Sequence, residues 1–265
     1  MLMRGFVLVT LCLLVGSLGA PESGRAETQG SPAPPEMLDM NVTTLPQLAA
    51  RILTMEYIPG EPGTLIYGTG RGFVYLYRVE KGRVRSAAKT NLWKGIKKVD
   101  LADLDRDGRP EIMVLTKEAM LYALDLETLK VVWSTEEGYF EGVSCFTVAD
   151  MEDDGENEII LLADNYLFVF DVGSGYERWK SLVEYEATHI LAGDVDGDNM
   201  KELILSNGVV LDSRLYDEEW IYEQSFGHCM DLFDIDGDGV LEVVTLDGAG
   251  DLQIVDVDDR ARKWK

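Results

Sequence analysis

The sequence predicts an all-β protein, a β-propeller of about five four-stranded blades. Three observations support this fold class: an acidic motif repeats along the chain, a tryptophan stands at a fixed place in each repeat, and short β-rich runs alternate with turns. The four copies of the acidic motif begin at Asp103, Asp150, Asp194 and Asp234, which are 47, 44 and 40 residues apart. Units of about this length with four strands have the size of propeller blades.

The tryptophans follow the same repeat. Each unit carries an aspartate eight residues before a tryptophan, and the four pairs are Asp125 and Trp133, Asp171 and Trp179, Asp212 and Trp220, and Asp256 and Trp264. Four equal spacings, in addition to four acidic motifs, indicate that one structural unit is repeated.

The elements of one unit follow in a regular order, which the first acidic unit illustrates. Residues 99–101 form a short β-rich run before the acidic motif, and the apolar residues 112–115 follow it. A turn leads to a second run at residues 121–124, and a last strand ends near Trp133. Short runs separated by frequent turns indicate strands, because helices need longer runs.

A fifth, degenerate unit precedes these four. Residues 65–77 resemble the strand pair that follows each acidic motif, and Trp93 supplies the tryptophan of this unit. Residues 56–64 stand where the acidic loop is expected, but they lack its carboxylate spacing. We therefore expect no ion in this unit and assign residues 48–265 to the propeller.

The acidic motifs have the chemistry of calcium-binding loops. Carboxylates at positions 1, 3 and 5 of a tight loop converge, a Gly or Asn at position 6 allows a positive φ, position 7 offers a carbonyl and position 9 a further carboxylate. Such an all-oxygen cage suits Ca²⁺ better than Mg²⁺, so about four Ca²⁺ ions are predicted. The candidate ligands are Asp103, Asp105, Asp107, Arg109 and Glu111; Asp150, Glu152, Asp154, Glu156 and Glu158; Asp194, Asp196, Asp198, Met200 and Glu202; and Asp234, Asp236, Asp238, Val240 and Glu242.

Two other interpretations of these motifs are weaker. An EF-hand needs a bidentate Glu at position 12 and flanking helices, whereas position 12 here is Val114, Leu161, Leu205 or Thr245 and the flanks are β-rich. Four solvated acidic turns that bind nothing would leave sixteen aligned carboxylates to repel one another.

The acidic loops, followed by EIMVL, EIILL, ELILS and EVVTL, resemble the FG-GAP/VCBS repeats of integrin-α-type β-propellers over roughly residues 48–265. The resemblance implies calcium in loops at the blade edges of an exported protein used for adhesion or ligand binding. Integrin-type propellers usually have seven blades, and this chain departs from them with five. The stretch from Leu121 to Trp133 is also similar to the repeats of quinoprotein dehydrogenases, which we interpret as shared strand and turn chemistry.

The N-terminus has the pattern of an export signal. Residues 6–15 form an apolar run of ten residues, which suits a signal peptide and is too short to span a bilayer. Cleavage is expected after Ala26, so residues 1–26 are a signal peptide and residues 27–47, rich in proline, a flexible leader or linker. The alternative is a hydrophobic helix that is buried or tethers the chain. The signal peptide predicts a secreted, periplasmic or cell-surface protein that does not span the membrane.

Composition excludes several classes of function. The chain has 48 Asp and Glu against 24 Lys and Arg, a net charge of −24, which repels nucleic acid. Only His189 and His228 are available, so multi-histidine metal sites are excluded. Beyond the signal peptide, Cys145 and Cys229 occupy equivalent places in their repeats, and we expect two buried free thiols.

The predicted function is that of an exported calcium-binding propeller that binds a protein or carbohydrate ligand. No catalytic constellation stands out, so an enzyme is not predicted. The alternatives are a propeller-based carbohydrate-active enzyme, with carboxylates in the central mouth, and an accessory subunit that completes a larger assembly. No clear spare strand closes the ring, although residues 37–45 are a candidate, and this predicts a strained five-blade ring, or an oligomer or partner that completes the propeller.

Overall fold

The computed structural model describes residues 52–58, 62–81, 83–246 and 250–264. These residues form twenty strands in five antiparallel sheets of four strands each. Within the described ranges, no helix is long and apolar enough to cross a membrane. The predicted signal peptide, residues 1–26, and the predicted leader, residues 27–47, lie outside them.

Each sheet is one blade, and its strands follow one another along the chain. The first blade contains β1 (Ile52–Ile58), β2 (Gly63–Thr69), β3 (Phe73–Glu80) and β4 (Arg83–Asn91). The second contains β5 (Ile96–Ala102), β6 (Glu111–Thr116), β7 (Leu121–Leu124) and β8 (Val131–Ser134). The third contains β9 (Val143–Ala149), β10 (Glu158–Ala163), β11 (Tyr166–Asp171) and β12 (Glu177–Lys180). The fourth contains β13 (Ile190–Gly193), β14 (Glu202–Leu205), β15 (Val209–Leu211) and β16 (Glu218–Ile221), and the fifth β17 (Met230–Phe233), β18 (Glu242–Leu246), β19 (Leu252–Asp256) and β20 (Ala261–Trp264).

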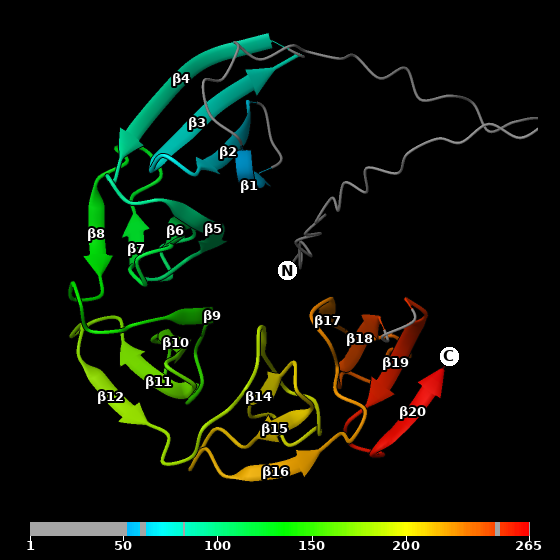
Figure 1. The fold of residues 1–265 in the computed structure, drawn as a ribbon. Coiled ribbons are helices and arrows are strands. Elements are labelled where there is room, and N and C mark those ends of the chain that lie inside the picture. Colours follow the sequence, from blue (N-terminus) through cyan, green and yellow to red (C-terminus); the bar gives the residue numbers. More distant parts are fainter. Residues whose placement is uncertain (1–51, 59–61, 82, 247–249, 265) are drawn as a thin grey trace, which may run out of the picture.

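The blades stand side by side around a common centre (Figure 1). In every blade the first strand lies innermost and the fourth outermost, as a consecutive antiparallel meander requires. The second strand of each of the blades from the second to the fourth is fully buried or nearly so, because neighbouring blades cover both of its faces. The prediction of five four-stranded blades is confirmed.

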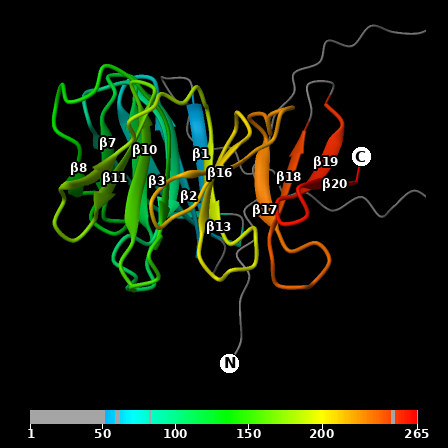
Figure 2. The ribbon, with the colours of Figure 1, turned by 90° about the horizontal axis from the view of Figure 1, so that it is seen from below.

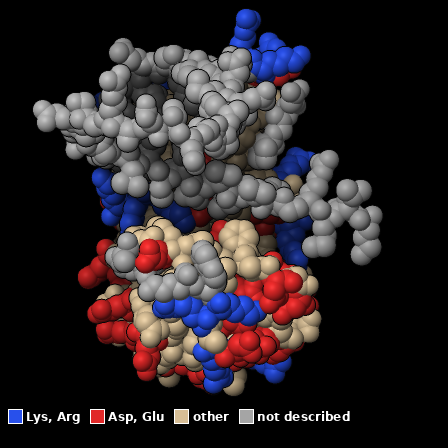
Figure 3. All heavy atoms as spheres, turned by 90° about the vertical axis from the view of Figure 1, so that its right-hand side faces the viewer, with Lys and Arg blue, Asp and Glu red and all other residues tan. Residues whose placement is uncertain are grey.

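The five blades form an open arc. The sheets of β1–β4 and β17–β20 lie at its two ends, apart from one another, so each has only one neighbouring blade among the described residues (Figures 1 and 2). The strained closed ring is therefore not what these residues form. Figure 3 faces the open side: acidic side chains gather over the fifth blade, at the bottom of the view, and Lys and Arg form a band among them.

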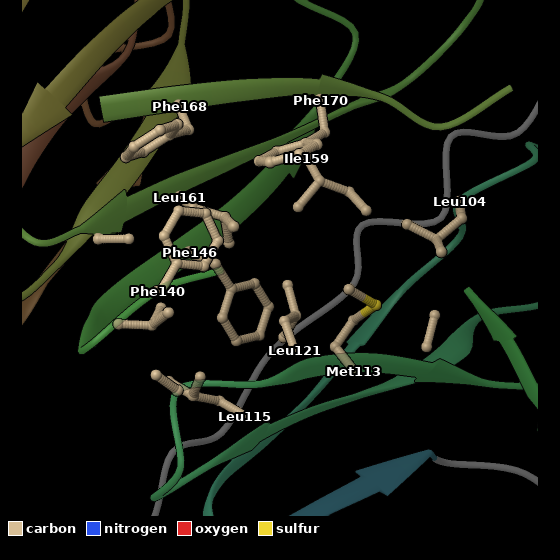
Figure 4. Close-up of a cluster of buried hydrophobic side chains, with 14 residues drawn as sticks. Leu104, Met113, Leu115, Leu121, Phe140, Phe146, Ile159, Leu161, Phe168 and Phe170 are labelled. Carbon is tan, nitrogen blue, oxygen red and sulfur yellow. The ribbon is translucent and has the colours of Figure 1, made fainter. Parts of the chain in front are cut away.

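Hydrophobic side chains fill the spaces between adjacent blades. The cluster between the second and third blades contains Met113 and Leu115 from one sheet and Ile159, Leu161 and Phe168 from the other (Figure 4). Three similar clusters lie between the other adjacent pairs of blades. Each blade is thus held by apolar burial against its neighbour, which makes the arc a rigid support for its loops.

Three expectations need correction. Trp93 lies in the turn after β4, not in a last strand, and is 87% exposed. Glu56 lies within β1 rather than in a loop. Cys145 is buried, but Cys229 is exposed, although both thiols are free. Cys229 precedes β17, whose residues are all exposed or half-buried, because the fifth blade is at the end of the arc.

Candidate cation sites in the acidic loops

The four acidic loops, residues 103–110, 150–157, 194–201 and 234–241, connect the first and second strands of the second to fifth blades. Contacts join each loop to the next. Asn157 Nδ2 donates to the carbonyl of Asp103 at 2.6 Å, Lys201 Nζ to that of Asp150 at 2.6 Å, and Leu241 N to that of Asp194 at 3.0 Å. The loops therefore lie in a row along one rim of the arc.

All four loops share one hydrogen-bonding pattern. The N–H of position 6 donates to the carboxylate of position 1, at 2.9 Å from Gly108 to Asp103 and 3.1 Å from Asn199 to Asp194. The N–H of position 7 (Arg109, Glu156, Met200 or Val240) donates to the carboxylate of position 5. Position 6 has the predicted positive φ in every loop, and position 4 has one as well, which the sequence did not reveal. These hydrogen bonds fold all four loops into the same tight turn.

The carboxylate at position 9 is almost fully buried in the third, fourth and fifth blades, and Glu111, in the second blade, is half-buried. Glu158 and Glu202 are 1% exposed and Glu242 is 2% exposed. One oxygen of each accepts the N–H of position 2, at 2.9 Å from Val195 to Glu202. Burial, followed by the nearby charge of Asp196, raises the pKa of Glu202 to about 8. A buried carboxylate that is costly to ionise is stabilised by a cation beside it.

The structure brings some of the predicted ligands together and not others. In the second blade, one oxygen from each of Asp103, Asp105 and Glu111 lies within 4.8 Å of the others. The same holds for Asp194, Asp196 and Glu202 in the fourth blade, and for Asp234, Asp236 and Asp238 in the fifth. Among the described residues, the third-blade carboxylates Asp150, Glu152, Asp154 and Glu158 form no such group.

One oxygen in the second blade lacks a partner. Oδ1 of Asp103 is buried and accepts no hydrogen bond from any described residue. A buried, unsatisfied carboxylate oxygen is rare in proteins, because it loses its hydration without compensation. Because Asp103 groups with Asp105 and Glu111, this free oxygen is available to bind a cation there.

Side-chain cations pair with carboxylates in the loops of the third and fifth blades. Arg106 Nη1 contacts Asp150 Oδ2 at 2.6 Å, and Arg178 contacts both Glu152 and Glu158, the latter at 3.5 Å. In the fifth blade, Lys263 Nζ lies 2.6 Å from Asp236, 2.9 Å from Glu242 and 2.7 Å from Asp256. These three carboxylates raise the pKa of Lys263, which holds its positive charge in place.

A second group of charged residues lies toward the centre. The inner strands β5, β9, β13 and β17 line a cavity of about 650 Å³, and Lys98, Asp100 and His189 are among the lining residues. Lys98 Nζ lies 2.7 Å from Asp100. Burial, and then the charge of Asp100, raises the pKa of Glu56 on β1 to about 7. Sequence reasoning missed the pairing of Glu56 with Asp100, because only the packing of β1 beside β5 brings these two carboxylates together.

Five meander blades in an arc, with acidic loops along one rim, define a β-propeller with candidate cation sites. No protein family matched the sequence, and no curated protein matched it. Solved structures confirm the fold: BBS1N in complex with ARL6DN has a TM-score of 0.57 at 14% identity, covering 80% of this chain and 67% of that chain. Saccharomyces cerevisiae Sqt1 has a TM-score of 0.58 at 13% identity, covering 80% of this chain and 60% of Sqt1. The chain thus spans about two thirds or less of these structures.

Proposed function

We propose that this chain is an exported calcium-binding β-propeller that acts as a protein or carbohydrate interaction module. The observation that carries the calcium proposal is the convergence of Asp103, Asp105 and Glu111, with the unpartnered Oδ1 of Asp103 among them. Carboxylate oxygens are the ligands that Ca²⁺ prefers, and an irregular loop suits its flexible coordination better than the strict octahedron of Mg²⁺.

Two considerations support the interaction module. Loops on a rigid scaffold are where binding residues concentrate, and the acidic loops form a continuous rim on packed blades. BBS1N, which has a similar fold, was solved in complex with ARL6DN, so that protein binds a protein partner. Export remains a proposal that depends on the signal-like pattern of residues 1–26.

Calcium titration by calorimetry, together with metal analysis after dialysis, tests the proposal. We expect binding in the range of about 10⁻⁴ to 10⁻³ M, as in extracellular calcium modules, and poor competition by Mg²⁺. Replacing both Asp103→Asn and Asp105→Asn should remove one ion, whereas Glu136→Gln, at an exposed position outside the loops, should remove none. Absence of bound calcium at millimolar concentration would contradict the proposal.

The central carboxylates favour a second candidate, a carbohydrate-active enzyme. Glu56, with a pKa of about 7, has the protonation behaviour of a general acid, and the carboxylate of Asp100 is close enough to raise that pKa further. The cavity of about 650 Å³ lined by Asp100 is large enough for a small ligand. Hydrolysis of a polysaccharide panel that is lost in Glu56→Gln would establish this activity, and its absence across the panel would leave the interaction module.

A further inference from the structure

The last strand of each acidic blade contains a β-bulge directly before its tryptophan. In the second blade, Ala123 pairs with Trp133 and Leu124 with Val131, so Val132 is the extra residue. The pairing shifts at the same place in the other three blades. The extra residues at these equivalent positions, which we call the bulge residues, are Val132, Arg178, Glu219 and Lys263.

A bulge turns the side chain of its extra residue away from the regular alternation of the strand. In the third blade this brings Arg178 to Glu152 and Glu158, and in the fifth it brings Lys263 to Asp236 and Glu242. The bulge residues of the other two blades carry no positive charge. The bulge residue therefore supplies a cation to two of the acidic loops and not to the other two.

The carboxylates respond to this difference. Where the bulge residue is not a cation, the position 9 carboxylate joins those of positions 1 and 3, within 4.8 Å, as Glu202 does with Asp194 and Asp196. Where it is a cation, Glu158 and Glu242 pair with it instead. The fifth blade retains only the exposed group of Asp234, Asp236 and Asp238.

The fourth blade is the clearest case of an uncompensated site. Glu202 is 1% exposed, and its one hydrogen bond given by the described residues comes from Val195 N to Oε2. The guanidinium of Arg214 pairs with Asp198 at 3.4 Å and is largely exposed, and no side-chain cation among the described residues pairs with Glu202, Asp194 or Asp196. A carboxylate that is this buried, lies beside two others and pairs with no side-chain cation indicates a site for a bound cation.

We propose that Arg178 and Lys263 are tethered cations that take the place of calcium in the third and fifth blades, so that the chain binds two Ca²⁺ ions, in the second and fourth blades, rather than four. This inference rests on the proposed calcium binding and refines it. It assigns the ion count to one residue in each blade, the bulge residue.

Counting ions by native mass spectrometry and calorimetry on the full chain tests the proposal, with Ca²⁺ as the probe. The wild-type chain should bind two ions. Lys263→Met and Arg178→Met should each bind three, and the double variant four. Lys180→Met is the matched control, because it removes the same charge from the residue that follows Trp179. The ammonium of Lys180 lies over the ring of Tyr166 rather than in an acidic loop. The Lys180→Met variant should bind two ions.

The converse variants keep the test decisive if an unpaired loop impairs folding. Val132→Lys and Glu219→Lys place an ammonium at the bulge of the second and fourth blades, and each should reduce the count from two to one. Four ions in the wild-type chain, or no change in any bulge variant, would overturn the tethered-cation proposal while calcium binding stood. No ion in the wild-type chain or in any variant would overturn the proposed function itself.

Discussion

Carboxylates at equivalent positions of the acidic loops have different environments, and a single neighbouring residue determines the environment of each. Glu202 and Glu242 occupy the same position in their loops and are almost equally buried. Lys263 lies 2.9 Å from Glu242, whereas Glu202 has no such neighbour among the described residues, and burial raises its pKa. The difference follows from the bulge residue, Lys263 in one blade and Glu219 in the other.

Glu56 gives a pH dependence that is independent of calcium. Its pKa of about 7 in the fold lies above its ordinary value of 4.5, so folding favours the protonated acid. This stabilisation is complete below about pH 4.5 and is lost as the pH rises through 7. A full shift of this size is worth about 3 kcal/mol, and screening by solvent reduces it to roughly 1–2 kcal/mol between pH 5 and 8.

Urea unfolding at both pH values, in the presence of EGTA, measures this effect. In the wild-type chain, the unfolding free energy should fall between pH 5 and 8, in part because Glu56 ionises. This part of the fall should be absent in Glu56→Gln and present in Glu136→Gln, which changes an exposed position. Equal pH dependence in Glu56→Gln and the wild-type chain would show that folding does not raise the pKa of Glu56.

At the scale of elements, the β14–β15 hairpin depends on one glycine. Gly208 has a φ of +101°, and a Cβ at this position would lie 2.1 Å from the carbonyl oxygen of Tyr222. Gly208 N also donates to Leu205 O, which closes the turn. Because backbone cannot yield as a flexible side chain can, we expect Gly208→Ala to lower the unfolding free energy by about 3 kcal/mol.

Gly138→Ala is the comparison for Gly208→Ala. Gly138 also has a positive φ, +75°, but nothing lies within 4 Å of the point where the Cβ of an alanine would stand. Gly138→Ala should lower the unfolding free energy by only about 1 kcal/mol, because it adds the backbone strain of a positive φ without a steric clash. Thermal or urea unfolding of the two variants separates the clash from the strain, and equal losses would contradict the role of Tyr222.

The sequence predicted the elements well where local patterns determine them. The run at residues 112–115 lies within β6 and that at residues 121–124 is β7, because buried second and third strands are short apolar stretches between turns. Trp93 shows the limit of the pattern: β4 is nine residues long and ends at Asn91, so the tryptophan falls in the following turn.

The candidate sites were predicted in part. The loop spacing predicted that Asp103, Asp105 and Glu111 meet, and they do, but the same spacing forms no such group in the third blade. The loop spacing could not reveal Arg178 or Lys263, because these residues lie in the last strand of their blades and contact the loop that follows the first strand. An alignment of the repeats on their tryptophans would have placed both at one position. The Glu56 and Asp100 pair depends on contact between blades and has no local signal.

For the whole molecule, the net charge of −24 is the dominant electrostatic fact. Self-repulsion opposes folding, and it is reduced by bound cations and by salt. Two Ca²⁺ sites of about 10⁻⁴ M at about 1 mM calcium contribute roughly 3 kcal/mol, and four would contribute about twice as much. EGTA should therefore lower the melting temperature by about 8 °C for a domain of this size.

Sodium chloride provides the control for that prediction. Raising it from about 0.05 to 0.5 M should stabilise the EGTA-treated protein more than the calcium-loaded protein, because fewer charges remain uncompensated in the latter. Differential scanning fluorimetry of the four conditions measures both effects. A melting temperature unaffected by EGTA would contradict a stabilising role for calcium.

The open arc also makes the described blades a linear array with two terminal units. Among the described residues, each blade contacts its neighbours through apolar clusters and through hydrogen bonds such as those from Asn157 to Asp103 and from Lys201 to Asp150. In such arrays, opening starts at the terminal units and proceeds inward. Amide hydrogen exchange should therefore be slowest in β10, in the middle blade, and faster in β2 and β18. Uniform protection in all five blades would mean that the two ends are joined in solution, by a second copy or a partner.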